Sequence, residues 1–369
     1  MQSHFSLIWE SVADAVPEHV ALIQGERRIS WRDYEDRASR LAQGLIDAGL
    51  GHNSKVGMYL YNSPEYAETN FAAMKISGVP INVNYRYLDY ELYYLLENAD
   101  IEALVFHTSL GDRVARVCDR LPMLKAMICV EDGPAEDGSM GPANAIPYDT
   151  FLSQASGAAK TQPQGDEIYM LYTGGTTGMP KGVMYPLDGF TEFFMRGFPP
   201  MIGLPPFEDA AQFGPAARQM VDANTTVVAM SGPPLMHGTG LFNALSTLLL
   251  GGTAITLEGR TFRPVELLDT IQAHGVNSVA LVGDAFARPI LAELDAAPDR
   301  WDISSLRVIV SSGVMWSQET KSGLARHNER LIMVDTLGSS EAIGMASNIS
   351  RGGDTSATAR FALGPHTRV

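Results

Sequence analysis

The sequence predicts an α/β protein with two doubly wound sheet subdomains packed together. Short apolar runs such as Val56–Leu60 alternate with helix-like segments such as Pro64–Ser77. This alternation stops after Val130 and resumes at Thr225, so the chain carries two blocks of it. A repeated strand–helix–strand order makes neighbouring strands parallel and places helices on the faces of their sheet. The length of 369 residues also suggests about two domains.

Composition narrows the class of protein. Hydrophobic residues make up 45% and charged residues 19% of the chain, which supports a large core and excludes intrinsic disorder. The formal net charge of −15 disfavours a nucleic-acid partner, because phosphates would be repelled. No apolar run in the sequence approaches the roughly 18 residues that would cross a bilayer. The first residues carry neither a basic segment nor a cleavage signal, so we expect a cytoplasmic protein.

The chain contains two cysteines, Cys118 and Cys129. Their spacing is not that of a metal site, and both have apolar neighbours in the sequence. We therefore expect two reduced core residues.

The N-terminal residues and the first block predict a regular series of elements. A helix over 7–15 is followed by two short strands, 21–23 and 28–30, which we expect to pair as a hairpin. Ser30, with Asp33 three residues later, predicts the start of a helix that ends at Gly49. Further strands are predicted at 56–60, 79–83, 103–107 and 124–130, with helices at 64–77, 89–99 and 111–121. Residues 131–164 are rich in Gly, Pro, Asp and Ser and predict a loop-like connector.

The second block follows an irregular stretch, 199–215, which contains five prolines. Its strands are predicted at 227–230, 254–257, 279–282, 308–311 and 331–335, and its helices at 239–250, 265–274, 285–294 and 318–327. The last strand runs into a Gly/Ser turn. We expect residues 1–50 to form a helix and hairpin segment that packs on the second subdomain. Residues 51–190 would be the first subdomain, 191–350 the second, and 351–369 the start of a further region.

The segment Tyr172–Val183, with the sequence YTGGTTGMPKGV, has the composition that a polyphosphate needs. Its glycines allow backbone N–H groups to turn toward an anion, and its threonine hydroxyls and Lys181 add donors and positive charge. A Walker A loop is excluded, because Pro180 precedes the lysine and Gly182 follows it. The alternative is a Gly/Thr surface turn, which the whole string disfavours.

Two further segments follow in a fixed order: Ser231–Gly238, with the sequence SGPPLMHG, and Asp335–Glu341, with the sequence DTLGSSE. Together with the Gly/Thr segment they resemble the signatures of the adenylate-forming superfamily, which includes acyl- and aryl-CoA synthetases, luciferases and adenylation domains. The resemblance covers essentially the whole chain. The segment Gly283–Pro289 is most similar to synthetases that act on steroid side chains and other bulky fatty acids. The implied fold is the large N-terminal domain of this superfamily.

The resemblance implies a role for each segment. Glu341 would bind Mg²⁺, and Ser340 would donate to the α-phosphate of ATP. His237 would lie beside the substrate carboxylate and orient it without acting as a general base. A helix N-cap is the alternative for Glu341, and a purely structural histidine is the alternative for His237.

A third segment, Gly313–Met315, matches the family's adenine-packing Gly-Ala-Pro. Here Val314 and Met315 replace Ala and Pro, and Leu337 stands where the family has an adenine-stacking Tyr, so the aromatic stack is absent. A buried strand end would explain Gly313 and Val314 equally well. The implied nucleotide-binding residues are Thr173, Gly174, Gly175, Thr176, Thr177, Gly178, Lys181, Gly313, Val314, Met315, Asp335, Thr336, Leu337, Gly338, Ser339 and Ser340, and the implied catalytic residues are Lys181, His237 and Glu341.

The resemblance implies ATP-dependent activation of a bulky hydrophobic acid to an acyl-adenylate and then an acyl-CoA, with ATP, Mg²⁺ and coenzyme A required. A homodimer stays open. Two alternatives also stay open: an adenylating enzyme with a carrier protein as acceptor, and a non-catalytic module that binds a nucleotide or an acyl group. For the acid, Gly283–Arg288 is the better candidate. A second set that could line an apolar tunnel is Met184, Phe190, Phe193, Phe194, Met195, Phe198, Met201 and Met236.

In the family, the Glu341 segment is followed by a β-barrel region with a ribose-binding acid and then by a small mobile domain with a catalytic lysine. The present sequence ends about where that barrel begins. We therefore expect a truncated form without the small domain, which alone would be inactive or crippled.

Overall fold

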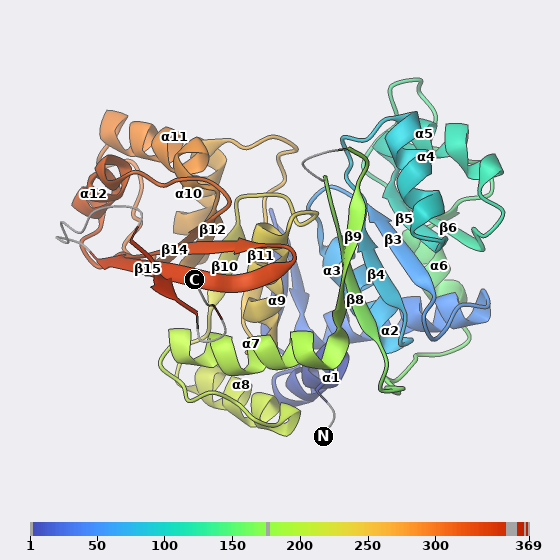
Figure 1. Ribbon diagram of the computed structural model, residues 1–369, viewed down its shortest axis with the longest axis horizontal. Coiled ribbons are helices and arrows are strands. Elements are labelled where there is room, and N and C mark those ends of the chain that lie inside the picture. The colour runs from blue at the N-terminus through green and yellow to red at the C-terminus, as the bar shows by residue number, and fades with distance from the viewer. Residues whose placement is uncertain (1–2, 175–177, 352–359, 365–366, 368–369) are drawn as a thin grey trace. The chain divides into compact units, whose positions relative to one another are not determined.

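The computed structural model describes residues 3–174, 178–351, 360–364 and 367 (Figure 1). The chain divides into two compact units. Unit 1 comprises 1–21, 29–225 and 249–251, and unit 2 comprises 22–28, 226–248 and 252–369. Helices and parallel-rich sheets form both units, so the predicted α/β class is confirmed. Among the described residues, no helix combines the length and the apolar character that crossing a membrane requires.

The sheet of unit 1 has seven strands among the described residues, in the order β7-β6-β5-β3-β4-β8-β9. Its pairs are parallel except β8–β9, which is antiparallel. The strands are β3 (Lys55–Tyr59), β4 (Val79–Asn82), β5 (Ile101–His107), β6 (Ala126–Val130), β7 (Ile146–Pro147), β8 (Ile168–Thr173) and β9 (Lys181–Pro186). The helices are α1 (Phe5–Ala15), α2 (Trp31–Asp47), α3 (Pro64–Lys75), α4 (Asp89–Asn98), α5 (Gly111–Val117), α6 (Tyr148–Gln154), α7 (Leu187–Met201) and α8 (Phe213–Asp222).

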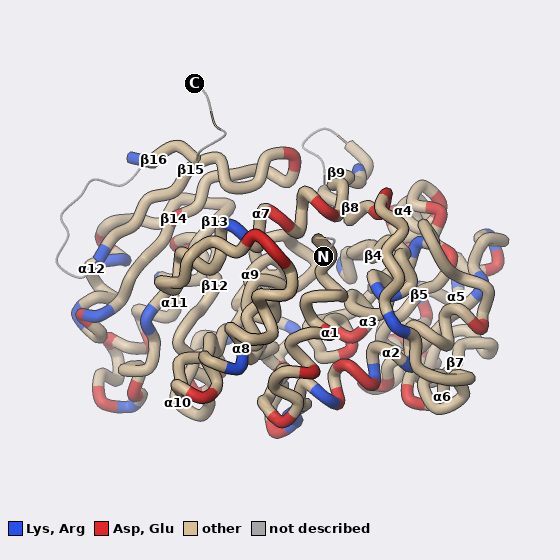
Figure 2. Tube along the Cα trace, turned by 90° about the horizontal axis from the view of Figure 1, so that it is seen from below, with Lys and Arg blue, Asp and Glu red and all other residues tan. Residues whose placement is uncertain are grey.

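The sheet of unit 2 has nine strands among the described residues, in the order β16-β15-β14-β13-β12-β10-β11-β1-β2. The strands are β1 (Val20–Gln24), β2 (Arg27–Ser30), β10 (Val228–Ser231), β11 (Thr253–Thr256), β12 (Ser278–Leu281), β13 (Val308–Ser312), β14 (Ile332–Ser339), β15 (Ala342–Arg351) and β16 (Ala362–Leu363). The helices are α9 (Gly238–Leu249), α10 (Pro264–His274), α11 (Gly283–Ala296) and α12 (Gln318–His327). Strands β10 to β13 contain no charged residue, which is typical of parallel strands covered on both faces, and Figure 2 shows β12 and β13 without charge.

Most predicted elements are confirmed to within a few residues, because burial follows the apolar periodicity that the sequence displays. Two stretches predicted to be irregular hold regular structure in part. The connector 131–164 contains β7 and α6, where Phe151 and Leu152 are buried. The stretch 199–215 overlaps the end of α7 and the start of α8.

The prolines at these helix ends are tolerated for a physical reason. Pro199 cannot donate to the Met195 carbonyl four residues earlier, and the Phe207 amide donates to that carbonyl instead, at 3.1 Å. Pro215 lies in the first turn of α8, where a missing N–H leaves no intrahelical bond unmade. Pro199, Pro200 and Pro215 therefore lie at helix ends, whereas Pro205 and Pro206 lie in the irregular chain between α7 and α8.

The compact units have other bounds than the expected segments. The expected boundary at 190/191 falls inside α7, and unit 1 continues to Thr225. Helix α8 packs against α1 in unit 1, where a Cβ on Gly214 would be 2.5 Å from Ser11 Oγ. Of residues 1–50, strands β1 and β2 join the sheet of unit 2, whereas α1 and α2 belong to unit 1.

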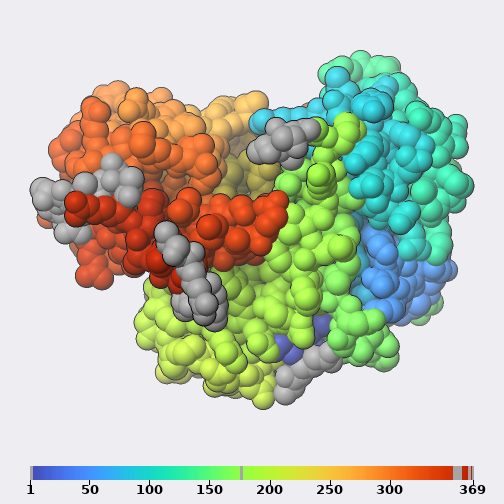
Figure 3. All heavy atoms as spheres, viewed as in Figure 1, coloured from blue at the N-terminus to red at the C-terminus, as the bar shows by residue number. Residues whose placement is uncertain are grey.

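Two details differ from the sequence prediction. Strand β15 was not predicted, and it continues the sheet antiparallel to β14 on the surface, where Figure 3 shows it in red. Its exposed positions include Ile349, so the alternation of polar and apolar residues is weak. Both cysteines are free thiols as expected, but Cys118 is only half-buried, and Cys129 alone is a core residue.

Candidate active site

The Gly/Thr segment joins two antiparallel strands of unit 1. Strands β8 and β9 pair from Ile168↔Pro186 to Thr173↔Lys181, so the glycines connect the ends of a hairpin. Gly174 is exposed, and Gly178 has a φ of +151°, a backbone conformation that favours glycine. The predicted residues Gly175, Thr176 and Thr177 lie outside the described residues.

Lys181 is the first residue of β9 and is exposed. Within the described part of the chain, its ammonium group forms no ion pair. Thr173, its partner across the hairpin, is half-buried. A cation beside exposed glycine backbone can hold an anion such as a phosphate without first breaking a salt bridge.

In unit 2, two predicted nucleotide-binding segments lie side by side. Strands β13 and β14 are parallel, with Ser311 opposite Asp335 and Ser312 opposite Thr336. The residues that follow β13 and those at the end of β14 therefore meet at the same sheet edge. Their apolar side chains are largely exposed there, with Val314 53%, Met315 72% and Leu337 49% accessible. Carboxyl ends of parallel strands are where open α/β sheets bind ligands, and exposed apolar groups there can cover the face of a purine.

Two side chains of the second segment have protein partners. The ammonium group of Lys321, a buried side chain on α12, forms an ion pair with the Asp335 carboxylate. The Thr336 hydroxyl donates to the Ser311 carbonyl at 3.1 Å. These contacts hold the strand end in place. A nucleotide contact through these two side chains stays a prediction.

Ser340 and Glu341 form the tight turn between β14 and β15, because Ser339 pairs with Ala342. The alternative of a helix N-cap is therefore wrong for Glu341. Its carboxylate is exposed at the tip of the hairpin, and no cationic partner for it exists among the described residues. The described residues also contain no group of three or more His, Cys, Asp or Glu side chains that could hold a metal. A single protein carboxylate suits Mg²⁺ that arrives with phosphate oxygens, since Mg²⁺ is usually bound by one or two carboxylates and the substrate.

His237 lies between β10 and α9, and its side chain is exposed. Its amide donates to the Pro234 carbonyl at 3.1 Å, which closes the Pro-Pro turn before the helix. Gly240 is required in the first turn of α9, because a Cβ there would be 2.7 Å from both the Pro233 and Pro234 carbonyl oxygens. The turn therefore fixes the backbone that carries His237 at the carboxyl end of β10.

Aromatic side chains lie at the same edge of the unit 2 sheet. The rings of Phe286, in the first turn of α11, and Phe262, before α10, are 4.4 Å apart between centroids. A Cβ on Gly232, which follows β10, would be 3.4 Å from the Phe286 ring. All three residues follow carboxyl ends of strands and form an apolar wall on the His237 side of that edge.

Most members of the second apolar set do not form such a wall. Phe190 stacks on Tyr169 and Tyr185, with centroids 4.9 Å apart in each pair, and contacts Phe5 and Phe194 in the core of unit 1. Phe194, Met195 and Met236 are also buried, whereas Met184, Phe193 and Met201 are exposed. Packing in the core explains the buried residues without a ligand.

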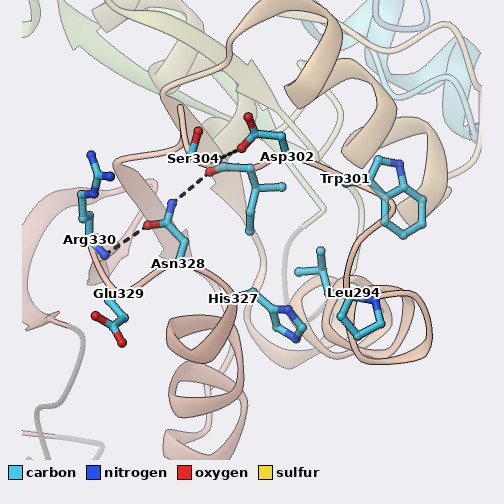
Figure 4. A pocket seen from close by; sticks show the side chains of 10 residues that line it. Leu294, Trp301, Asp302, Ser304, His327, Asn328, Glu329 and Arg330 are labelled. Carbon is cyan, nitrogen blue, oxygen red and sulfur yellow. Dashed lines mark hydrogen bonds between the residues drawn. The ribbon is translucent and has the colours of Figure 1, made fainter.

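A pocket of about 340 Å³ lies elsewhere in unit 2 (Figure 4). Leu294, Trp301, His327 and Asn328 line it, where α11 and α12 end and β13 and β14 begin. The Asn328 side-chain amide donates to the carbonyls of Ile303 and Leu306. The Trp301 ring N–H donates to the Asp269 carboxylate. This pocket is thus at the amino ends of the strands, opposite to the predicted nucleotide segments.

The predicted residues thus fall into two groups. Thr173, Gly174, Gly178 and Lys181 belong to unit 1. His237, Gly313–Met315 and Asp335–Glu341 belong to unit 2, where they follow carboxyl ends of β10, β13 and β14.

Comparison with known proteins decides the family. The model of the AMP-binding enzyme family matches residues 9–367. The chain belongs to the AMP-binding enzyme family. The resemblance to adenylate-forming enzymes that the motifs predict is therefore confirmed.

Relatives within the AMP-binding family carry related names. A medium/long-chain-fatty-acid–CoA/3-oxocholest-4-en-26-oate–CoA ligase of Mycolicibacterium smegmatis is 34% identical over 98% of this chain and 65% of its own length. A 3-oxocholest-4-en-26-oate–CoA ligase of Rhodococcus rhodochrous is also 34% identical, over 90% of this chain and 59% of its own length. The likeness to ligases for fatty and steroid acids is confirmed. The chain spans less than two thirds of the length of these relatives.

A solved structure agrees on the fold. A benzoate CoA ligase from Burkholderia xenovorans superimposes with a TM-score of 0.75 over 95% of this chain and 63% of its own, at 18% identity. At this identity the match shows the fold alone.

Sequence reasoning missed two residues that hold the candidate site. Lys321 lies in a polar helix, and no local pattern predicts its ion pair with Asp335. Asp284 is part of the Gly283–Pro289 match, but its contact with Ser317 depends on tertiary packing. The acid in the first turn of α11 is the only signal that could have drawn attention to it.

Proposed function

We propose that the whole protein is an acid–thiol ligase that activates a bulky hydrophobic carboxylic acid through an acyl-adenylate. The observation that carries this proposal is the paired edge of β13 and β14, where Gly313–Met315, Leu337 and the Ser340–Glu341 turn lie together. Membership of the AMP-binding family and the names of the relatives support it.

The proposed reaction has two steps. A carboxylate oxygen of the acid attacks the α-phosphorus of ATP, the bond to the β-phosphate oxygen breaks, and pyrophosphate leaves. The sulfur of coenzyme A then attacks the acyl carbonyl, the thiol loses its proton, and AMP leaves. Catalysis of this kind depends on positioned donors and charge, without a covalent intermediate on the protein.

Residues of this chain would divide that work. Lys181, Thr173, Thr176 and Thr177 would hold the β- and γ-phosphates, with backbone N–H groups of the intervening glycines. Ser340 would donate to the α-phosphate. The exposed turn that carries Glu341 fits a Mg²⁺ ion shared with the nucleotide, and the ion would neutralise phosphate charge when bound.

The acid would lie on the His237 side of the unit 2 edge. His237 would hydrogen-bond its carboxylate, and the Phe262–Phe286 wall would contact its hydrocarbon part. An apolar wall favours long or polycyclic acids over acetate, because each buried methylene contributes about 0.8 kcal/mol.

The test is acid-dependent exchange of labelled pyrophosphate into ATP by the whole protein, followed by mass spectrometry after addition of coenzyme A. Exchange that rises from acetate to bulky acids, with formation of acyl-CoA, is the expected result. Exchange without acyl-CoA would support a carrier protein as acceptor. Binding without exchange would support a non-catalytic module and contradict the proposal.

A further inference from the structure

We infer that Asp284 is a positioning residue that fixes the Gly313–Met315 segment for nucleotide binding, an inference that rests on the proposed function. Asp284 is the second residue of α11, on the turn that also carries Phe286. It touches no predicted nucleotide residue with its side chain and acts through Ser317. Helix α11 thereby connects the wall proposed for the acid with the segment proposed for the adenine.

The start of α11 lies directly against the segment. Val282 provides no capping side chain, and the first two amides of the helix donate outside it. The Gly283 amide donates to Ser311 Oγ at 2.9 Å, and the Asp284 amide donates to the Met315 carbonyl at 3.2 Å. Strand β13 and the segment after it therefore supply acceptors for two of the amides that a helix N-terminus leaves unpaired.

Gly283 makes this approach as close as two backbones allow. Its φ is +51°, and an added Cβ would be 2.5 Å from the Met315 carbonyl oxygen and 2.6 Å from a methyl group of Val314. The segment thus cannot move toward α11. A separate restraint is needed to keep it from moving away.

The Asp284 carboxylate provides that restraint. Its Oδ1 accepts from the Ser317 amide at 3.0 Å and from the Ser317 hydroxyl at 3.1 Å, while Oδ2 accepts from Arg288 at 3.0 Å. Ser317 also caps α12 by accepting from the Thr320 amide. One carboxylate therefore holds the C-terminal end of the segment, and Ser311 holds the start through Gly283.

The exposed side chains of the segment explain why it needs such a clamp. Val314 and Met315 are 53% and 72% accessible, so little side-chain packing holds them. A surface that must meet a purine with these side chains gains affinity when its backbone is fixed before binding, because less conformational entropy is lost. Without the Asp284 carboxylate, the bonds from α11 amides to Ser311 and Met315 remain, and the two bonds from Ser317 are lost.

The test compares Asp284→Ala, Asp284→Asn and a matched control in the 369-residue chain. The control is Asp302→Ala, which removes a carboxylate that accepts from the Ser304 amide at 2.8 Å, at the other end of the strands. AMP affinity and the affinity for a bulky acid are measured by titration calorimetry well below each melting temperature. Hydrogen exchange of residues 313–317 is measured without ligand.

The inference predicts that Asp284→Ala weakens AMP binding at least tenfold, leaves acid binding within threefold, and speeds exchange at 313–317 at least tenfold. Asp284→Asn keeps an acceptor at Oδ1, so its AMP affinity should stay within about threefold of that of the unchanged chain, as should that of Asp302→Ala. Should Asp284→Ala fail to fold, Ser317→Ala takes its place in the test, and we expect it to weaken AMP binding about threefold.

A lowered melting temperature with unchanged AMP affinity would overturn the inference, because the clamp would then be structural only. Equal losses of AMP and acid affinity would overturn it as well. If the unchanged chain binds no AMP, the proposed function fails instead. Hydrogen exchange at 313–317 then still reports whether the Asp284–Ser317 contact holds the segment.

Discussion

At the scale of single residues, Lys181 is the side chain most directly suited to an anion. It is exposed at the start of β9, next to glycine backbone, and no described residue neutralises it. Lys181→Ala should weaken ATP binding about tenfold, because hydrogen bonds to charged groups contribute about 1.5–3 kcal/mol. Lys125→Ala is the control, since Lys125 is an exposed lysine paired with Glu102. Equal ATP affinity of the two variants in a calorimetric titration would mean that Lys181 does not contact the nucleotide.

Glu341 carries the prediction for the metal. Glu341→Gln keeps the shape of the side chain and removes the charge that Mg²⁺ prefers. The extra stabilisation that Mg²⁺ gives the ATP-bound chain should therefore fall, while stabilisation by ATP alone should stay unchanged. Thermal melting with and without Mg²⁺ measures both, and Glu329→Gln, an exposed glutamate before β14, is the control. A metal effect that survives in Glu341→Gln at full size would exclude this carboxylate as the ligand.

At the scale of elements, the N-cap of α1 predicts a dependence of stability on pH. His4 caps the helix by accepting from the Ser6 amide with Nδ1, which requires a neutral ring. Burial lowers the pKa of His4 from 6.5 to about 4, although Glu167 and Glu10 oppose the shift. The pKa of His4 is lower in the folded chain than in the unfolded chain. The free energy of unfolding that depends on a neutral His4 is therefore fully present above pH 6.5 and is lost as the pH falls toward 4. At about 1.4 kcal/mol per pKa unit, the loss amounts to about 3 kcal/mol.

His4→Asn keeps a capping acceptor that does not titrate in this range. Its free energy of unfolding, from urea titrations, should therefore fall less between pH 7 and pH 4.5 than that of the unchanged chain. His52→Asn, at a histidine whose side chain is 38% exposed, should retain most of the original pH dependence. The same slope in the unchanged chain and in His4→Asn would disprove the role of His4.

Elements were predictable where one periodicity dominates. Helix α2 follows directly from apolar spacing, with Ala38, Leu41 and Leu45 buried, and the order of strands and helices fixes a parallel sheet. Pro199 and Pro200 predict a break in the helix, but both lie in the last turn of α7, where the Phe207 amide bonds to the Met195 carbonyl. Strand β15 lacks clean alternation because much of it is exposed, and it joins the sheet through pairing with β14 and β16.

The candidate site was predictable as segments and not as contacts. Gly313–Met315 and Asp335–Glu341 could be named because they resemble signatures of the family, and β13 and β14, which lead to them, prove to be neighbours. The Asp335–Lys321 pair and the Asp284–Ser317 bonds join residues 14 and 33 positions apart. Such contacts depend on how helices pack on a sheet, which spacing along the chain does not encode.

At the scale of the whole molecule, the proposed function requires that this chain binds the adenylate of a bulky hydrophobic acid. The most direct measurement is calorimetric titration of the 369-residue chain with non-hydrolysable acyl-sulfamoyl adenosines that carry acetyl, octanoyl, hexadecanoyl or steroid side-chain acyl groups. The account predicts that affinity rises from acetyl to the bulky groups, by up to about fourfold per buried methylene. Equal affinity across the series, or preference for the acetyl compound, would contradict it.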